Sequence, residues 1–154
     1  MYSVLFVCRQ NRYRSPIAMA LLRQQVKDTP DEAEWLIDSA GTWTDEGKPP
    51  LPGVIAEMTR RGIDLSKHRA RTVNREMIND YHLIITVDKD QHEALCLEFR
   101  DAARRIHLLT EMANERGDVS DMEGDNLALF NEVADDIDDL LKRGFEKIKR
   151  LAKG

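Results

Sequence analysis

The chain has 154 residues, of which 42% are hydrophobic and 33% are charged, so it holds enough apolar material for one globular core. This balance excludes a small disulfide-held scaffold and a disordered tail. Because 28 acidic residues outnumber 23 basic ones, the total charge predicts no non-specific binding to nucleic acid or to an anionic membrane. We expect a single domain, residues 1–154.

The first predicted elements are a strand, a short loop and a helix. Residues 4–7 are an apolar run, too short for a signal peptide or a membrane span, and predict a buried strand. Ser15 followed by Pro16 predicts a helix start, with Ser15 as N-cap and Pro16 as the first helical residue. Apolar residues at helical spacing then continue to Val26.

Three further β-branched runs predict strands over residues 35–39, 83–87 and 106–109. A polar loop with three prolines follows the second strand and leads to a helix over residues 54–61, which Gly62 ends. Asp88, with Gln91 three residues later, resembles a capping box that opens the helix carrying Cys96. Strands alternating with helices are typical of βαβ units in a parallel sheet.

The last predicted element is one long helix over residues 127–151 that packs on the sheet. Its apolar residues share one helical face, and charged residues occupy the rest. We therefore predict an α/β, single-domain, three-layer fold with a four-stranded parallel sheet, helices on both faces, and a phosphate-binding loop after the first strand.

The stretch between the first strand and its helix carries the chemistry. Cys8 ends the strand, and Arg14 stands six residues later, just before the predicted helix. Ligands bind at strand C-termini in open α/β sheets, and a helix N-terminus there offers unpaired N–H groups and a partial positive charge. Arg14 can present two parallel N–H donors to an oxyanion. We call residues 8–15 the anion loop.

The same positive field favours the thiolate form of Cys8, which makes it a candidate nucleophile under a bound phosphate. The alternative is that Cys8 is an ordinary buried cysteine and Arg14 a solvated arginine. The functional interpretation is favoured by the combination of features: a strand, a loop, a Ser-Pro helix start and the further arginines Arg9 and Arg12. Cys8 and Cys96 lack metal-ligand spacing, so we expect no metal and no cofactor, and a reduced, cytoplasmic chain.

Several ordered segments resemble the low-molecular-weight protein tyrosine phosphatases, whose fold is shared with thioredoxin-coupled arsenate reductases. They are Val4-Leu5-Phe6-Val7-Cys8, Asn11-x-x-Arg14-Ser15-Pro16, Asp38-Ser39-Ala40-Gly41-Thr42, Gly62-Ile63-Asp64-Leu65-Ser66-x-His68-Arg69-Ala70-Arg71, and Leu83-Ile84-Ile85 through Asp88. The resemblance spans nearly the whole chain.

This resemblance implies a two-step hydrolysis without a metal, in which Cys8 attacks phosphorus and water then releases inorganic phosphate. It implies that backbone N–H groups of Arg9, Gln10, Asn11, Arg12 and Tyr13, with the Arg14 guanidinium, hold the phosphate oxygens. It further implies that Ser15 donates to the thiolate, that Asn11 holds the loop turn together with Ser39 and His68, and that Asp121 is the general acid.

The chain departs from the family pattern at both loops. Met122 and Glu123 stand where the family has a proline and an aromatic residue, which puts a preference for phosphotyrosine in question. Gln10 replaces a usual glycine and has to accept the loop's backbone angles, at a steric cost if φ is positive. Tyr13 replaces a second cysteine. Trp43 stands where the family shapes its substrate rim, or it packs against the proline-rich loop.

Three functional hypotheses follow. The first is a phosphatase acting on a phosphorylated protein side chain, phosphotyrosine before phosphoarginine, with phosphate as product and neither nucleic acid nor membrane as partner. The second is a phosphate-binding module that has lost efficient catalysis. The third, arsenate reduction, is disfavoured because only Cys96 is present where a relay needs a resolving partner. The sequence leaves the oligomeric state open.

Overall fold

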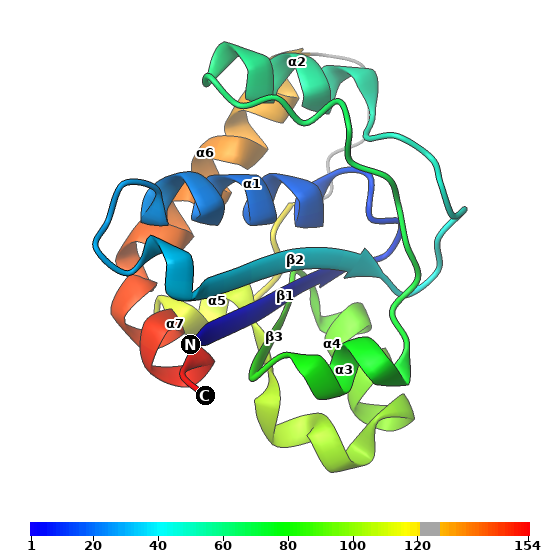
Figure 1. Cartoon of the computed structure of the whole chain (residues 1–154). Helices are drawn as coiled ribbons and strands as arrows, with labels where there is room; N and C mark the ends of the chain where they lie inside the picture. Colours follow the sequence, from blue (N-terminus) through cyan, green and yellow to red (C-terminus); the bar gives the residue numbers. More distant parts are fainter. Residues whose placement is uncertain (121–126) are drawn as a thin grey trace.

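The central feature of the computed structural model, which describes residues 1–120 and 127–154, is a parallel sheet (Figure 1). Its four strands are β1 (Tyr2–Cys8), β2 (Trp35–Gly41), β3 (Leu83–Thr86) and β4 (Ile106–Leu108). Their order is β2-β1-β3-β4, and all neighbouring pairs are parallel. The predicted sheet is confirmed, and β1 lies inside it with its C-terminal Cys8 opposite Gly41 of β2.

The side chains of β1 alternate between two hydrophobic cores. Val4, Phe6 and Cys8 belong to one core, whereas Leu5 and Val7 belong to the other. This alternation follows from the period of two along a strand. Because both faces of the sheet are buried, β1 is almost entirely apolar. The predicted three-layer arrangement is confirmed.

Helices cover both faces (Figure 1). The core that contains Cys8 also holds residues of α1 (Arg14–Val26), α2 (Pro52–Arg60), α5 (Leu109–Met112), α6 (Leu127–Arg143) and α7 (Phe145–Ala152). The other core holds residues of α3 (Arg75–Asp80), α4 (Lys89–Glu98) and the 3₁₀ helix Arg100–Arg105. A further 3₁₀ turn, Glu32–Glu34, precedes β2. None of the helices in the described ranges is long and apolar enough to cross a membrane.

The prediction of one helix over residues 127–151 was wrong, because the chain breaks at Gly144 between α6 and α7. Gly144 lies against the backbone of Met112, and a Cβ at this position would approach the Met112 carbonyl carbon to 2.8 Å. Only glycine permits this close approach, which lets α6 contact α5 and α7 turn toward β1. The apolar face is continuous in sequence, but the helix axis is not.

The predicted N-cap of α1 was also wrong. The N-cap residue is Tyr13, whose side chain makes no capping hydrogen bond, and Ser15 is already helical. The Ser15 hydroxyl instead lies 2.9 Å from the Cys8 thiol and 3.4 Å from the carbonyl oxygen of Ala40. The first turn of α1 is therefore open toward the anion loop rather than closed by a serine.

The buried Tyr81, which is hydrogen-bonded to Asp38 of β2, makes the free energy of unfolding depend on pH in the alkaline range. Tyr81 donates to Asp38 Oδ2 at 2.6 Å, and burial followed by this carboxylate raises the pKa of Tyr81 from 10.0 to about 12. The unfolded chain loses this proton first, so the contribution is complete below pH 10 and is lost as pH rises toward 12. We expect a loss of up to about 2–3 kcal/mol of unfolding free energy from this group.

Urea unfolding of wild type and Tyr81→Phe, at neutral pH and at several pH values between 10 and 12, measures this contribution. The wild type should lose more stability than the variant across that interval, because the phenylalanine has no proton to release. Parallel curves for the two proteins would contradict the prediction.

Candidate active site

Cys8 ends β1 at the floor of the anion loop, and two hydrogen-bonding groups converge on its sulfur. The backbone N–H of Asn11 donates to Cys8 Sγ at 3.3 Å, and the Ser15 hydroxyl lies 2.9 Å from the same atom. Cys8 is 3% exposed and Ser15 is fully buried. Donors directed at a sulfur stabilise its anionic form, and the first turn of α1 adds its positive end.

Asn11 holds the turn of the loop. Its φ is 60°, a left-handed conformation that asparagine tolerates better than most residues. The buried side chain donates from Nδ2 to Ser15 Oγ and to Ser39 Oγ, both at 2.9 Å, and accepts at Oδ1 from the Arg71 N–H at 3.1 Å. His68 Nε2 lies 3.0 Å from the Asn11 carbonyl oxygen. The network thus joins β1, β2 and the segment after α2.

The left-handed backbone conformation in the anion loop lies at Asn11 and not at Gln10, where the sequence pattern suggested it. Among the described residues, the non-glycine positions with positive φ are Asn11, Asp28 and Asn114, so Gln10 carries no such conformation. A glycine at position 10 is therefore not needed for a left-handed turn in this chain. Gln10 is exposed at the mouth of the loop instead.

Replacing Asn11 separates the backbone role from the side-chain role. We expect Asn11→Ala to lower the unfolding free energy by about 2–4 kcal/mol, because three buried hydrogen bonds are lost and a Cβ remains at positive φ. Asn11→Gly loses the same hydrogen bonds without that strain, so its loss should be smaller by about 1 kcal/mol. Chemical denaturation of both variants gives the two values. Equal losses would show that the backbone conformation contributes nothing.

Arg14 lies 4% exposed at the start of α1, and two distant groups hold its guanidinium. Nη1 donates to the Val119 carbonyl oxygen at 3.0 Å, and Nη2 pairs with Asp88 Oδ2 at 2.9 Å. The other oxygen of Asp88 accepts from the Gln91 N–H at 2.8 Å, which confirms the predicted N-cap of α4. Sequence reasoning found Asp88 only as a cap. Its contact with Arg14 spans 74 residues, which no local pattern encodes.

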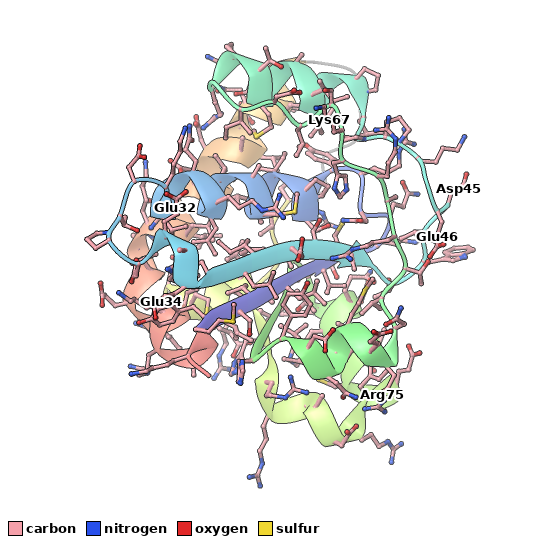
Figure 2. All side chains as sticks on the ribbon, in the orientation of Figure 1. Glu32, Glu34, Asp45, Glu46, Lys67 and Arg75 are labelled. Carbon is pink, nitrogen blue, oxygen red and sulfur yellow. The ribbon has the colours of Figure 1, made fainter. Side chains whose placement is uncertain are left out.

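The rim of the loop is built by the segment after β2. The N–H groups of Thr42, Trp43 and Leu51 donate to the carbonyl oxygens of Cys8, Arg9 and Arg12 at 3.0, 2.9 and 3.1 Å. Gly41 permits this packing, because a Cβ there would come within 2.6 Å of the Arg9 carbonyl oxygen. Asp45 and Glu46 of the same segment are exposed (Figure 2).

A surface cavity of about 300 Å³ lies at this rim, lined by Arg9, Gln10, Arg12 and Trp43 among others. Trp43 is 70% exposed and lies under the Arg9 guanidinium, 4.7 Å from ring centroid to Cζ. Arg12 instead turns to the proline-rich loop and donates from Nε to the Pro49 carbonyl oxygen at 2.7 Å. Tyr13 packs its ring edge against Phe130 of α6, 5.0 Å between centroids. Trp43 and the loop residues Arg9 and Gln10 are therefore exposed groups at the entrance to the anion loop.

The two cysteines lie in different surroundings. Cys8 belongs to the core under α1, whereas Cys96 of α4 packs against the core on the other face of the sheet. Burial raises the pKa of the Cys96 thiol, and the Glu111 carboxylate adds to this rise. Within residues 1–120 and 127–154, no group of three or more His, Cys, Asp or Glu could hold a metal ion. Asp121, the predicted general acid, lies outside the described residues, as do Met122 and Glu123.

The comparisons with known proteins agree with this geometry. A sequence model described as low molecular weight phosphotyrosine protein phosphatase matches residues 3–153. The chain is 29% identical over 144 residues to the probable low molecular weight protein-tyrosine-phosphatase EpsP of Ralstonia nicotianae, covering 94% of this chain and 91% of that one. It is 38% identical over 111 residues to the low molecular weight phosphotyrosine protein phosphatase of Gallus gallus, 70% of each chain.

The fold is also similar to that of a solved low molecular weight protein tyrosine phosphatase from T. tengcongensis. The TM-score is 0.89 at 28% identity, and the match covers 96% of this chain and 99% of that one. The likeness therefore extends over the sheet, its helices and the anion loop together.

Proposed function

Because this chain belongs to the low molecular weight phosphotyrosine protein phosphatase family, a family of cysteine-dependent phosphatases, we propose that it hydrolyses phosphotyrosine in proteins with Cys8 as nucleophile. The observation that carries the assignment of Cys8 is the convergence of the Asn11 N–H and the Ser15 hydroxyl on its sulfur. Both groups can donate to a thiolate at Cys8, which lies under a loop of backbone N–H groups where a phosphate group fits.

In the first proposed step the Cys8 thiolate attacks phosphorus in line with the ester oxygen. The S–P bond forms as the P–O bond to the tyrosine breaks, and Asp121 gives its proton to the departing oxygen. In the second step a water attacks phosphorus, its proton returns to Asp121, and the S–P bond breaks to release inorganic phosphate and the thiolate. Neither step requires a metal or a cofactor.

The remaining loop residues hold the charge that is transferred. The N–H groups of Arg9, Gln10, Asn11, Arg12 and Tyr13 and the Arg14 guanidinium would bind the phosphate oxygens, more strongly as the transition state develops. Ser15 would stabilise the thiolate when it is the leaving group of the second step. The Asn11 side chain, Ser39 and His68 have a positioning role, because they hold the loop through hydrogen bonds that do not involve the anion.

The rim supports a phosphorylated protein side chain as substrate. Trp43 offers an exposed aromatic surface beside Arg9, and an aromatic leaving group can pack on it while acidic neighbours meet the arginine. Arsenate reduction is not supported, since Cys96 packs on the opposite face of the sheet from Cys8. We further propose that residues 1–154 act as one phosphatase domain in the cytoplasm.

The general acid distinguishes an enzyme from a phosphate-binding module. We expect Asp121→Asn to reduce the turnover of phenyl phosphate by about 10²- to 10⁴-fold, because its basic leaving group needs a proton. The loss for para-nitrophenyl phosphate should be smaller, since that leaving group departs readily as an anion. Steady-state assays of both substrates measure the difference.

The matched control is Glu123→Gln, which removes a charge from the same segment and should leave both rates nearly unchanged. Phosphate binding without turnover in the wild type, or an Asp121→Asn variant as fast as wild type on both substrates, would favour the binding module.

A further inference from the structure

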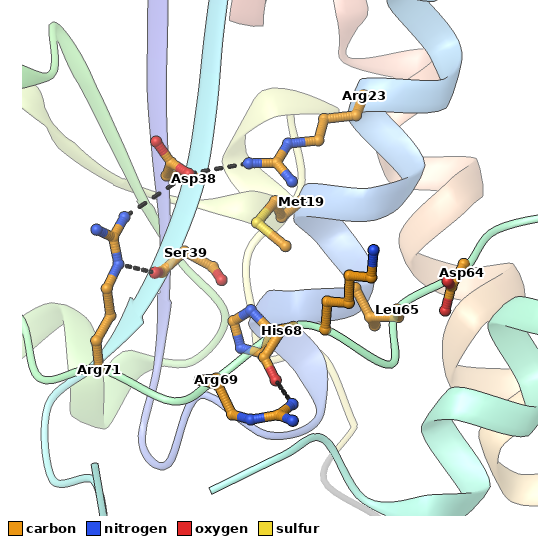
Figure 3. Close-up of a pocket in the computed structure, with 10 residues that line it drawn as sticks. Met19, Arg23, Asp38, Ser39, Asp64, Leu65, His68, Arg69 and Arg71 are labelled. Atoms are coloured by element: carbon orange, nitrogen blue, oxygen red, sulfur yellow. Dashed lines mark hydrogen bonds and ion pairs between the residues drawn. The ribbon is translucent and has the colours of Figure 1, made fainter. Parts of the chain in front are cut away.

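A second cavity, of about 270 Å³, lies behind the anion loop between α1, β2 and residues 64–71 (Figure 3). Its charged lining consists of four cations, Arg23, Lys67, Arg69 and Arg71, and two carboxylates, Asp38 and Asp64. This cavity has no role in the proposed hydrolysis. Its volume is ample for a small oxyanion.

The cations of this cavity are only partly neutralised. Asp38 is shared between two of them, Arg23 at 2.9 Å and Arg71 at 3.7 Å, and also accepts from Tyr81. Arg69 donates to the carbonyl oxygens of Ser66 and His68, both at 2.8 Å, rather than to a carboxylate.

Lys67 adds to the positive excess. It is exposed (Figure 2), and it makes no hydrogen bond or salt bridge with any residue in the described ranges. The Asp64 carboxylate is occupied locally, where it accepts from the N–H and the hydroxyl of Ser66. The cavity therefore carries more positive than negative charge.

The wall nearest the anion loop consists of Ser39 and His68, which also line the cavity. Both residues hold Asn11. The Ser39 hydroxyl accepts from the Asn11 side chain, and His68 Nε2 lies within hydrogen-bonding distance of the Asn11 carbonyl oxygen. Nε2 of His68 lies against the Asn11 carbonyl oxygen, and no residue in the described ranges makes a hydrogen bond with Nδ1, so Nδ1 is the ring nitrogen left for a ligand in the cavity. A molecule bound here would lie one residue away from the loop that surrounds Cys8.

We propose that this cavity is a second oxyanion site, which binds a phosphate dianion separately from the anion loop and acts on that loop through His68. Four cations around one cavity match a dianion, and guanidinium groups bind phosphate oxygens with good geometry. Binding at this site does not depend on the proposed hydrolysis. It gives the protein a means to respond to phosphate, either as the free ion or as a phosphate group on another molecule.

The protonation of His68 links the two sites. Burial lowers the pKa of His68, the Asn11 carbonyl opposes this, and Arg23, Arg71 and Arg69 lower it further. The charged groups that line the cavity together with His68 are Arg23 from α1, Asp38 from β2, and Asp64, Lys67, Arg69 and Arg71 from its own segment. A bound dianion offsets the cations and favours the imidazolium, so anion and proton bind cooperatively. An imidazolium also donates more strongly to the Asn11 carbonyl oxygen.

The test is an NMR titration of the protein with inorganic phosphate that follows the backbone amides of residues 9–14 and 64–71. We expect two different dissociation constants, one for each group of amides. Lys67→Glu should weaken the constant for residues 64–71 by about tenfold or more, and leave the constant for residues 9–14 within about twofold. The Lys67 side chain is exposed and makes no hydrogen bond or salt bridge with the residues that the structure describes, so the variant should fold as the wild type does.

The matched control is Lys153→Glu, which makes the same charge reversal beside Tyr2, at the opposite end of β1 from Cys8. It should change neither constant. Methylphosphonate, a stable analogue of a phosphate monoester, distinguishes the sources: binding of both probes assigns the site to phosphate groups in general, and binding of phosphate alone restricts it to the free ion.

Sulfate isolates the role of His68, because it stays a dianion throughout the pH range in which a histidine titrates. The affinity of sulfate for residues 64–71 should rise as the pH falls. A single dissociation constant shared by both groups of amides and unchanged in Lys67→Glu would overturn the proposal.

Discussion

Cys8→Ser should abolish hydrolysis of para-nitrophenyl phosphate, with a fall in kcat of at least about 10⁴-fold. Oxygen replaces the sulfur on which the Asn11 N–H and the Ser15 hydroxyl converge. A serine hydroxyl is far less acidic than a thiol, and the described surroundings of Cys8 contain no base within hydrogen-bonding distance to activate it. The variant should still bind phosphate, because the loop's N–H groups remain.

The control for this experiment is Cys96→Ser, which removes the other thiol from the opposite face of the sheet. It should keep nearly the full rate. Rapid acid quench of the wild type during turnover should trap a phosphorylated cysteine at position 8, detectable by mass spectrometry. Full activity in Cys8→Ser would refute the proposed nucleophile.

Arg14→Lys should reduce kcat for para-nitrophenyl phosphate by about 10²- to 10³-fold. The lysine keeps the charge but replaces a planar fork with a single ammonium group. That group cannot satisfy Val119 and Asp88 together as the guanidinium does at 3.0 and 2.9 Å. Nor can it present two parallel donors to the phosphate oxygens in the transition state.

Asp88→Asn tests whether Arg14 depends on its partner. Asparagine keeps the N-cap of α4 but loses the ion pair with the buried Arg14, so we expect a fall in kcat of about tenfold and a lower free energy of unfolding. Circular dichroism shows whether each variant folds. Comparing the change in kcat with the change in KM distinguishes a loss of positioning from a loss of substrate binding. Equal activity of wild type and Arg14→Lys would contradict the role of the guanidinium fork.

The sheet could be predicted from the sequence because its strands are buried on both faces and are therefore continuous apolar runs. The cap at Asp88 was also readable, since capping depends on residues three apart. Helix α3 was not predicted from the sequence. Ile78 is its only buried residue, so the segment shows no helical spacing of apolar residues. Asn74, which accepts from the Met77 N–H at 2.9 Å, was the available signal.

In the candidate site, too, the residues of one local motif could be predicted from the sequence, whereas their distant partners could not. Cys8, Asn11, Arg14 and Ser15 are neighbours in sequence, so one motif indicated them together. Arg71 was missed, because it supports Asn11 through its backbone N–H, an interaction that any residue type can make. The network through Ser39 and His68 rested on the family resemblance, since neither residue is informative alone.

The three backbone hydrogen bonds that attach the rim to the anion loop have an evolutionary consequence. The hydrogen bonds from Thr42, Trp43 and Leu51 to the anion loop come from main-chain N–H groups, which do not depend on the identity of the side chain. Mutation can therefore exchange the side chains at the entrance while the scaffold beneath the sulfur keeps its shape. Substrate preference in such a protein can drift among relatives without a matching change in the reaction it performs.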